Sequence, residues 1–162
     1  MAVAVLITPK VEGEVCFYPK KTGVLVACRF TRLPPGYHGF HIHRAGDLRG
    51  EGCKAACDHW HRGSPTTHGG PPTHKGPRHT GDLGNLKMEE GESLLEKTFF
   101  LKHVSIDELY GRSVIVHEDE DDYGKGPHDD SKTTGHSGAR IACAVIGRME
   151  GCSGATRKRK ST

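Results

Sequence analysis

Histidine side chains are the groups in this chain best suited to do chemistry. Three of them fall within His38–His43, and His41 and His43 are two residues apart in a stretch that reads as a strand. Side chains two residues apart in a strand point to the same face, so these two imidazoles can be directed at one point. Further candidates follow along the chain: His59, His61, His68, His79, Asp82 and His117. Imidazole suits zinc and copper, and a carboxylate ligand favours zinc, so the set suffices for two metal sites.

The composition predicts short strands joined by turns and long loops. The chain has 162 residues, which is one domain by length and enough for an ordinary hydrophobic core. Hydrophobic residues make up 34%, whereas glycine reaches 22 residues and proline 9. Such a turn-rich composition favours an all-β fold over a helical one.

The apolar pattern places the strands between Gly-bearing turns. They are expected at residues 2–8, 14–18, 24–30, the stretch ending at His43, 97–102, 113–117 and 141–146. Residues 44–85 and 118–140 are polar and too long to be simple connections, so both are predicted to be functional loops. About eight short strands without a convincing helix predict a β-sandwich or barrel.

The charge distribution argues against a basic body that binds nucleic acid. The net charge is +3, but residues 157–160 are all lysine or arginine, which leaves −1 for residues 1–156. Residues 1–7 lack the charged start of a secretory signal and read as a strand. No stretch approaches the ~18 apolar residues of a membrane span. We therefore expect a cytoplasmic protein with no membrane contact, in which disulfides are uncommon.

The last residues differ from the rest of the chain. Residues 1–150 are predicted to form the folded domain, and residues 151–162 a basic, disordered tail. A solvated terminus is the simple interpretation of this tail. The alternative is a nuclear, nucleic-acid or particle-packaging signal.

Five motifs, in the right order, resemble the copper/zinc superoxide dismutase family. They are Gly39–His43, His68–Pro71, Arg78–Asn85, Val114–Glu118 and Gly138–Gly147. The resemblance implies an all-β fold, an eight-stranded antiparallel Greek-key β-barrel of immunoglobulin-like sandwich architecture with two long functional loops. It also implies an oxidoreductase that converts superoxide to dioxygen and hydrogen peroxide.

The same resemblance assigns ligands for one copper and one zinc per subunit. Copper would be held by His41, His43, His59 and His117. Zinc would be held by His59, His68, His79 and Asp82. His59 would bridge the two metals and act in catalysis. Asp121 would accept hydrogen bonds from His68 and from one copper ligand, His43 or His41.

The resemblance further implies roles for residues around the copper. Arg140 would attract the anion and Thr134 would form the opposite wall of the channel. Cys53 and Cys143 would form a disulfide, with Cys57 as a competing partner.

Several positions leave alternatives open. His61 or His74 could replace a neighbouring zinc ligand, because the chain is roughly three residues longer there than the usual pattern. The acidic run at residues 118–122 predicts weaker steering of superoxide than in the family. Arg148 replaces an apolar residue common at the family's interface, yet a homodimer remains the expectation. No proline flanks Arg140, so a copper chaperone is not obviously required.

Two other classes of protein compete with this interpretation. One is a non-catalytic copper- or zinc-binding module, which would be expected to lose Arg140 or a copper histidine, and this chain keeps them. The other is an interaction protein that uses the barrel as a scaffold for its basic tail.

Overall fold

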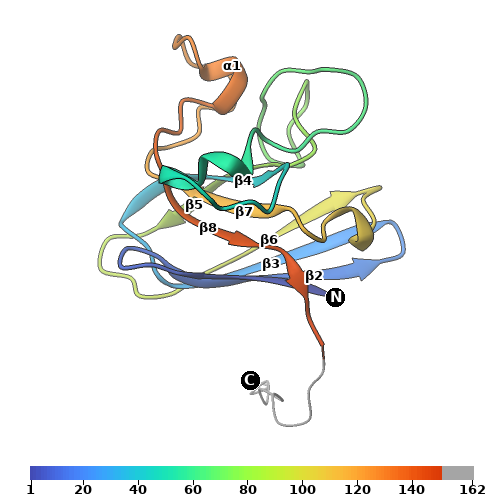
Figure 1. Ribbon diagram of the computed structural model, residues 1–162. Helices are drawn as coiled ribbons and strands as arrows, with labels where there is room; N and C mark the ends of the chain where they lie inside the picture. Colours follow the sequence, from blue (N-terminus) through green and yellow to red (C-terminus); the bar gives the residue numbers. More distant parts are fainter. Residues whose placement is uncertain (151–162) are drawn as a thin grey trace.

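Two antiparallel sheets pack face to face in the computed structural model, which describes residues 1–150 (Figure 1). The first has the order β6-β3-β2-β1-β9 and the second the order β5-β4-β7-β8. The strands of the first sheet are β1 (Ala2–Ile7), β2 (Glu12–Lys20), β3 (Gly23–Arg32), β6 (Leu95–Lys102) and β9 (Gly147–Arg148). Those of the second are β4 (Gly36–His43), β5 (Asp82–Met88), β7 (Ser113–His117) and β8 (Arg140–Val145). The all-β prediction is confirmed.

The core lies between the sheets and follows from alternation along the strands. In β3, Val24, Val26 and Phe30 point inward and are fully buried. From β4, Phe40 and Ile42 enter the same core. The ring of Phe40 lies edge-on to Phe30, with 6.3 Å between centroids. The alternate residues of β4 therefore face away from the core, where the second sheet is covered by loops.

Three details differ from the sequence prediction. Asp82–Met88 forms β5, although its start was expected to lie in a loop, and the strand exists because it pairs with β4. A two-residue strand, β9, pairs with β1 and brings the number of strands in the described residues to nine rather than eight. Short helical turns also occur: η1 (Glu51–Ala56), η2 (Ile106–Glu108) and α1 (Ser131–Thr134).

The two long loops lie together over the four-stranded sheet, on the side away from the other sheet (Figure 1). The backbone N–H of His68 donates to the carbonyl of Lys132 at 2.8 Å, which joins one loop to the other. The N–H of Gly39 donates to Asp119 and that of Ile42 to Gly81, both at 2.8 Å, and these bonds fasten the loops to β4. Both loops are thus fastened to the backbone of that strand.

No helix in the described part of the chain is long and apolar enough to cross a bilayer. The predicted basic tail, residues 151–162, lies outside the described residues.

Candidate metal centre

Four buried histidines converge on the outward face of the four-stranded sheet. His41 and His43 alternate with the core residues of β4, and His117 ends the neighbouring strand β7. His59 comes from the first loop and forms an isolated β-bridge with His43. One ring nitrogen from each of the four lies within 4.8 Å of the others. The structure therefore brings together the four residues predicted to hold copper.

Three of these rings are oriented by a hydrogen bond from the nitrogen that points away from the group. His43 Nδ1 donates to the carbonyl of Cys57 at 2.7 Å, and His117 Nδ1 donates to that of Gly138 at 3.1 Å. His41 Nε2 donates to Asp121 Oδ2 at 2.7 Å. Each bond fixes the tautomer and leaves the other nitrogen of the ring facing the centre of the group.

The nitrogens that face inward have no protein partner. Within the described residues, the buried side-chain atoms without a hydrogen-bond partner are His41 Nδ1, His43 Nε2, His59 Nε2, His68 Nδ1 and His117 Nε2. A buried polar atom left unpaired costs about 1–3 kcal/mol, so five in one place require an explanation. Bound metal supplies it, because all five atoms belong to residues of the two groups that could hold an ion.

Burial also keeps the strand-borne rings neutral. It lowers the pKa of His117 to about 3, and the neighbouring imidazole of His59 acts in the same direction. Burial together with His59 lowers the pKa of His41 and His43 well below the ordinary value for histidine. Neutral imidazole is the form that binds a metal ion.

A second group surrounds the carboxylate of Asp82, at the start of β5. His59 Nδ1 lies 2.9 Å from Asp82 Oδ1, His68 Nδ1 lies 3.1 Å from it, and His79 Nδ1 lies 3.3 Å from it. The backbone N–H groups of Gly69 and His79 donate to Oδ2 at 3.0 and 2.7 Å. Burial alone would raise the pKa of Asp82, but the three histidines around it outweigh burial and lower this pKa, so the carboxylate stays ionised. Three imidazoles and one carboxylate are a donor set that suits tetrahedral zinc.

His59 belongs to both groups and uses a different nitrogen in each. Its Nδ1 faces Asp82, whereas its Nε2 is one of the unpaired atoms beside His41. The rings of His59 and His41 stack with centroids 3.9 Å apart. This arrangement is the one required of a single imidazole that bridges two metal ions.

Asp121 connects the two groups from behind. Its Oδ2 accepts from His41 Nε2 and its Oδ1 accepts from His68 Nε2, both at 2.7 Å. Asn85 in β5 holds the backbone of Asp121 on both sides, accepting from its N–H at 2.8 Å and donating to its carbonyl at 3.0 Å. The sequence left open whether His41 or His43 donates to Asp121. In the structure His41 does so, and the outer nitrogen of His43 donates to the carbonyl of Cys57 instead.

His61 and His74 lie outside both groups. His61 Nδ1 accepts from the N–H of Thr80 at 3.2 Å, and His61 Nε2 donates to the carbonyl of Ser64 at 2.9 Å. Both nitrogens of this ring are therefore used in holding the loop. His74 lies against Gly70, where an added β-carbon would meet its Nδ1 at 2.8 Å.

The predicted disulfide between Cys53 and Cys143 is confirmed, and Cys57 is not part of it. Cys57 instead has φ 64° and ψ −149°, a backbone conformation that is essentially restricted to glycine. Its carbonyl accepts hydrogen bonds from His43 and from Arg140 Nη2. Arg140 Nη1 donates to the carbonyl of Cys53 at 2.8 Å, so the disulfide-bonded segment fixes the guanidinium.

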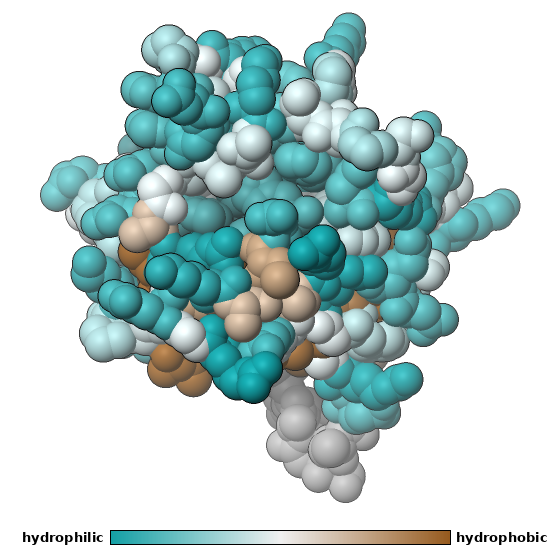
Figure 2. All heavy atoms as spheres, turned by 45° about the horizontal axis from the view of Figure 1, so that its top comes forward, coloured by the Kyte–Doolittle hydropathy of each residue, from teal (hydrophilic) through white to brown (hydrophobic). Residues whose placement is uncertain are grey.

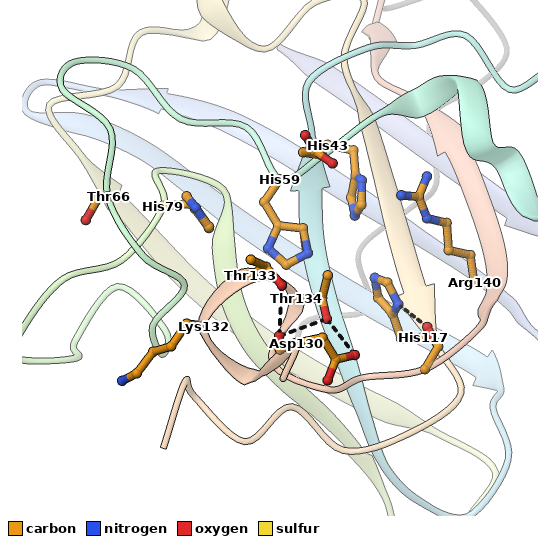
Figure 3. A pocket seen from close by; sticks show the side chains of 12 residues that line it. His43, His59, Thr66, His79, His117, Asp130, Lys132, Thr133, Thr134 and Arg140 are labelled. Atoms are coloured by element: carbon orange, nitrogen blue, oxygen red, sulfur yellow. Dashed lines mark hydrogen bonds between the residues drawn. The ribbon is translucent and has the colours of Figure 1, made fainter. Parts of the chain in front are cut away.

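Both groups open into one cavity of about 520 Å³. Figure 3 shows Arg140 beside His43 and His117, with Thr134 and Asp130 across the pocket. The face of the molecule that carries the two long loops is mainly hydrophilic (Figure 2). Sequence reasoning assigned no role to several residues that line the cavity, among them Asp58, Thr66, Asp130 and Thr133. Only Asp58 had a signal in the sequence, since it directly precedes His59.

Comparison with known proteins agrees with this geometry. The family model described as copper/zinc superoxide dismutase (SODC) matches residues 11–146. The chain is 39% identical over 150 residues to a superoxide dismutase [Cu-Zn] of Paramecium bursaria Chlorella virus 1, covering 90% of this chain and 77% of the relative. It is 41% identical over 157 residues to an extracellular superoxide dismutase [Cu-Zn] of Drosophila melanogaster, covering 90% and 84%.

A solved structure shows the same fold. The crystal structure of the clock protein EA4 superposes with a TM-score of 0.80 at 38% identity, covering 91% of this chain and 94% of that one. The sequence match extends over most of the chain, and the two histidine groups lie within the matched residues. This chain belongs to the copper/zinc superoxide dismutase family.

Proposed function

We propose that the two histidine groups hold one copper and one zinc and that the protein dismutates superoxide there. The observation that carries this proposal is the set of five buried, unpaired ring nitrogens around the shared residue His59. The all-nitrogen group of His41, His43, His59 and His117 suits copper, and the group containing Asp82 suits zinc. When bound, copper supplies a one-electron redox couple, and zinc supplies a fixed positive charge. Two superoxide anions and two protons thereby give dioxygen and hydrogen peroxide.

His59 is the residue that would move a proton. Its Nε2 has no hydrogen-bond partner in the protein, and the residue lines the cavity. Its Nδ1 is held on the side of Asp82, so the ring cannot turn away while Nε2 gains or loses a proton. A proton carried on Nε2 lies where the second superoxide is reduced, and water delivers the other proton.

Arg140 would bind the incoming anion. The guanidinium is permanently charged and lines the cavity beside two histidines of the copper group. Its two hydrogen bonds to the carbonyls of Cys53 and Cys57 hold it there. Thr134 lies across the pocket and limits its width, so that a small anion is favoured over a larger one.

Asp121 would position a ligand of each metal without touching the substrate. By accepting from His41 and His68, it sets both tautomers, so each inner nitrogen presents a lone pair. The backbone carbonyls of Cys57 and Gly138 do the same for His43 and His117.

Assembly and location are further parts of the proposal. We propose that two copies pair through the surface around Val5 and Val145, whose side chains are exposed by 53% and 41%. Tyr110 adjoins this surface. The positively charged Arg148 guanidinium covers one face of its ring, with 4.6 Å between Cζ and the ring centroid. We also propose a cytoplasmic location and a catalytic domain that spans residues 1–150. The oligomeric state is measured by light scattering and the location by cell fractionation.

The test is superoxide dismutation by purified protein whose metals have been counted. We expect about one copper and one zinc per chain together with fast turnover. Arg140→Ala should keep both metals and lose most of the rate, because it removes only the anion-binding charge. His117→Ala should lose copper as well as rate. Full metal occupancy without turnover would instead indicate a metal-handling module.

A further inference from the structure

The turn between β2 and β3 carries two positive charges that the described part of the chain does not pair. Lys20 and Lys21 are both exposed, and within residues 1–150 no salt bridge joins either of them to a carboxylate. Together with Thr22 and Ser105 they line a hollow of about 430 Å³. Lysine amines and hydroxyl groups are donors that proteins commonly present to phosphate oxygens. The chemistry of this hollow therefore suits a phosphate group.

The wall of the hollow is fixed by backbone hydrogen bonds. The N–H of His103 donates to the carbonyl of Thr22 at 2.8 Å, and the carbonyl of His103 accepts from the Arg62 guanidinium. Arg62 also forms an ion pair with Glu108, which neutralises that carboxylate. The other acid of η2, Asp107, is exposed. Two lysines against one unpaired carboxylate leave the hollow with a net positive charge.

The chain leaves the described fold on the same side of the five-stranded sheet. Arg148 in β9 pairs with Ala2, and Ala2 pairs with Phe17, three residues before Lys20. Because β9 is antiparallel to β1, it runs toward the edge that carries the β2–β3 turn. Neighbouring strands lie about 4.8 Å apart and rise about 3.4 Å per residue, so roughly 14 Å separates Arg148 from Lys20.

The sequence beyond the described residues supplies four more positive charges. Residues 157–160 are Arg-Lys-Arg-Lys, and six uncharged residues separate them from Glu150. A chain spans at most about 3.5 Å per residue, so residue 157 can be no more than about 25 Å from Glu150 and is long enough in reach to approach the β2–β3 turn. Six basic side chains thus gather at one side of a protein whose residues 1–156 sum to −1.

We propose that Lys20, Lys21 and residues 157–160, here called the basic end, bind the phosphate backbone of a nucleic acid. A duplex presents one negative charge per ~1.7 Å of its axis, so one face of it can neutralise several clustered lysines and arginines at once. Contacts of this kind position a protein on the backbone without reading base edges. The binding is therefore independent of base sequence.

Two other anionic partners fit the observations less well. An anionic bilayer is bound most firmly where apolar side chains accompany the charges, and the large apolar side chains exposed in residues 1–150 do not include any at positions 19–23 or 103–106. A sulfated polysaccharide is an extracellular polymer, whereas we propose a cytoplasmic location for this protein. Nucleic acid is the polyanion that shares that compartment.

The basic end leaves the metal cavity open. The hollow beside Lys20 shares no lining residue with the metal cavity. In Figure 1 the two long loops lie over the four-stranded sheet, whereas β2, β3 and β9 belong to the other sheet. The protein should therefore bind nucleic acid and turn over superoxide at the same time. Dismutation beside the nucleic acid rests on the proposed function, but the binding itself does not.

The test is fluorescence anisotropy of a labelled DNA duplex of about 20 base pairs, titrated with the full-length, copper- and zinc-loaded protein. We expect a Kd of about 10⁻⁵ M at about 100 mM salt, and a plot of log K against log salt with a slope of about −5, as six phosphate contacts imply. Lys20→Gln combined with Lys21→Gln should make the slope shallower by about 2 and weaken binding about tenfold or more. Changing residues 157–160 to glutamine should make it shallower by about 4.

Lys10→Gln combined with Lys75→Gln is the matched control. Both lysines are exposed, and Lys10 lies in the turn between β1 and β2, at the opposite edge of the sheet from Lys20. The control loses the same two charges elsewhere and should keep the affinity and the slope of the unchanged protein. Chondroitin sulfate and phosphatidylserine vesicles, matched to the duplex in charge concentration, should compete less well than unlabelled duplex.

Four results would overturn the inference. Unchanged binding after the double change at Lys20 and Lys21 would remove the turn from the site, and an equal loss in the control would show that only net charge matters. Stronger competition by the polysaccharide or the vesicles would identify the wrong polymer. A dismutation rate that falls as duplex saturates the protein would place the duplex at the cavity. Duplex binding without dismutation would refute the proposed function alone, and dismutation without duplex binding would refute the inference alone.

Discussion

The two halves of the metal centre are held in different ways. His41, His43 and His117 lie on two paired strands, so the sheet itself sets their spacing. His59, His68 and His79 come from a long loop and depend on one buried carboxylate, Asp82. The strand-borne half is therefore built by backbone hydrogen bonds, whereas the loop-borne half is ordered by side-chain contacts and metal. The first half should survive damage to the second, and the predictions below test this difference.

The largest effect is expected from Asp82→Asn. This change removes the only carboxylate of the loop-borne group, and with it the negative charge that its three histidines surround. Zinc affinity should fall by more than about 100-fold, while the strand-borne histidines continue to bind copper. Metal content after dialysis, measured by atomic emission, checks both parts. Equal loss of copper and zinc would show that the two halves are not separable.

The disulfide is expected to have the next largest effect. Replacing Cys53 and Cys143 together by serine opens a link across 90 residues of sequence. The free energy of unfolding should fall by about 4 kcal/mol through the entropy of the unfolded chain. Denaturant unfolding of the metal-loaded protein measures this change.

Cys57→Ser is the matched control for the disulfide, because this thiol is outside the bond and the substitution keeps the β-carbon. We expect the Cys53–Cys143 bond to remain intact in this variant. Reactive thiols are counted under denaturing conditions. Two additional thiols in this variant would show that Cys53 and Cys143 are no longer bonded, which would contradict the assignment of this disulfide.

Asp121→Asn tests the connection between the halves. The amide keeps the shape of the carboxylate but cannot accept from both His41 and His68. We expect a 10- to 100-fold loss of affinity for zinc and for copper, since such supporting carboxylates set ligand orientation. Competition with a chelator measures the two affinities. A loss confined to one metal would show that Asp121 serves only that half.

A smaller effect, this time a gain in stability, is expected from replacing Cys57 by glycine. Its φ and ψ lie in a region that costs other residues about 1–3 kcal/mol but that glycine adopts freely. Cys57→Gly should therefore raise the free energy of unfolding by about 1 kcal/mol, after the higher entropy of glycine in the unfolded chain is subtracted. Cys57→Ala is the comparison variant and should show no gain, because it keeps the β-carbon that causes the strain.

The difference between the halves also explains what the sequence could predict. Alternation in β4 places His41 and His43 on one face, opposite Phe40 and Ile42, and this needs no knowledge of the tertiary structure. Alternation does not say which outer nitrogen meets Asp121, because that depends on how a distant loop folds back, and the sequence left both histidines open.

The loop-borne half required the family resemblance rather than periodicity. His61 and His68 are equally plausible ligands by residue type, and only the folded loop separates them. Asp82–Met88 was expected to begin in a loop because its residues do not alternate, although pairing with β4 makes it a strand. The contact between Asp130 and His136 depends on the local conformation of a loop and had no signal in the sequence.

The smallest effect is expected at His61, the histidine of the first loop that lies outside the metal groups. His61→Asn keeps an acceptor near the position of Nδ1 for the N–H of Thr80 and loses the bond from Nε2 to the carbonyl of Ser64. One partly exposed hydrogen bond contributes about 0.5–1 kcal/mol, so stability should fall by no more than that. Zinc content should stay at one per chain, as measured by atomic emission. Loss of zinc in this variant would place His61 among the ligands and reverse the assignment of the loop-borne half.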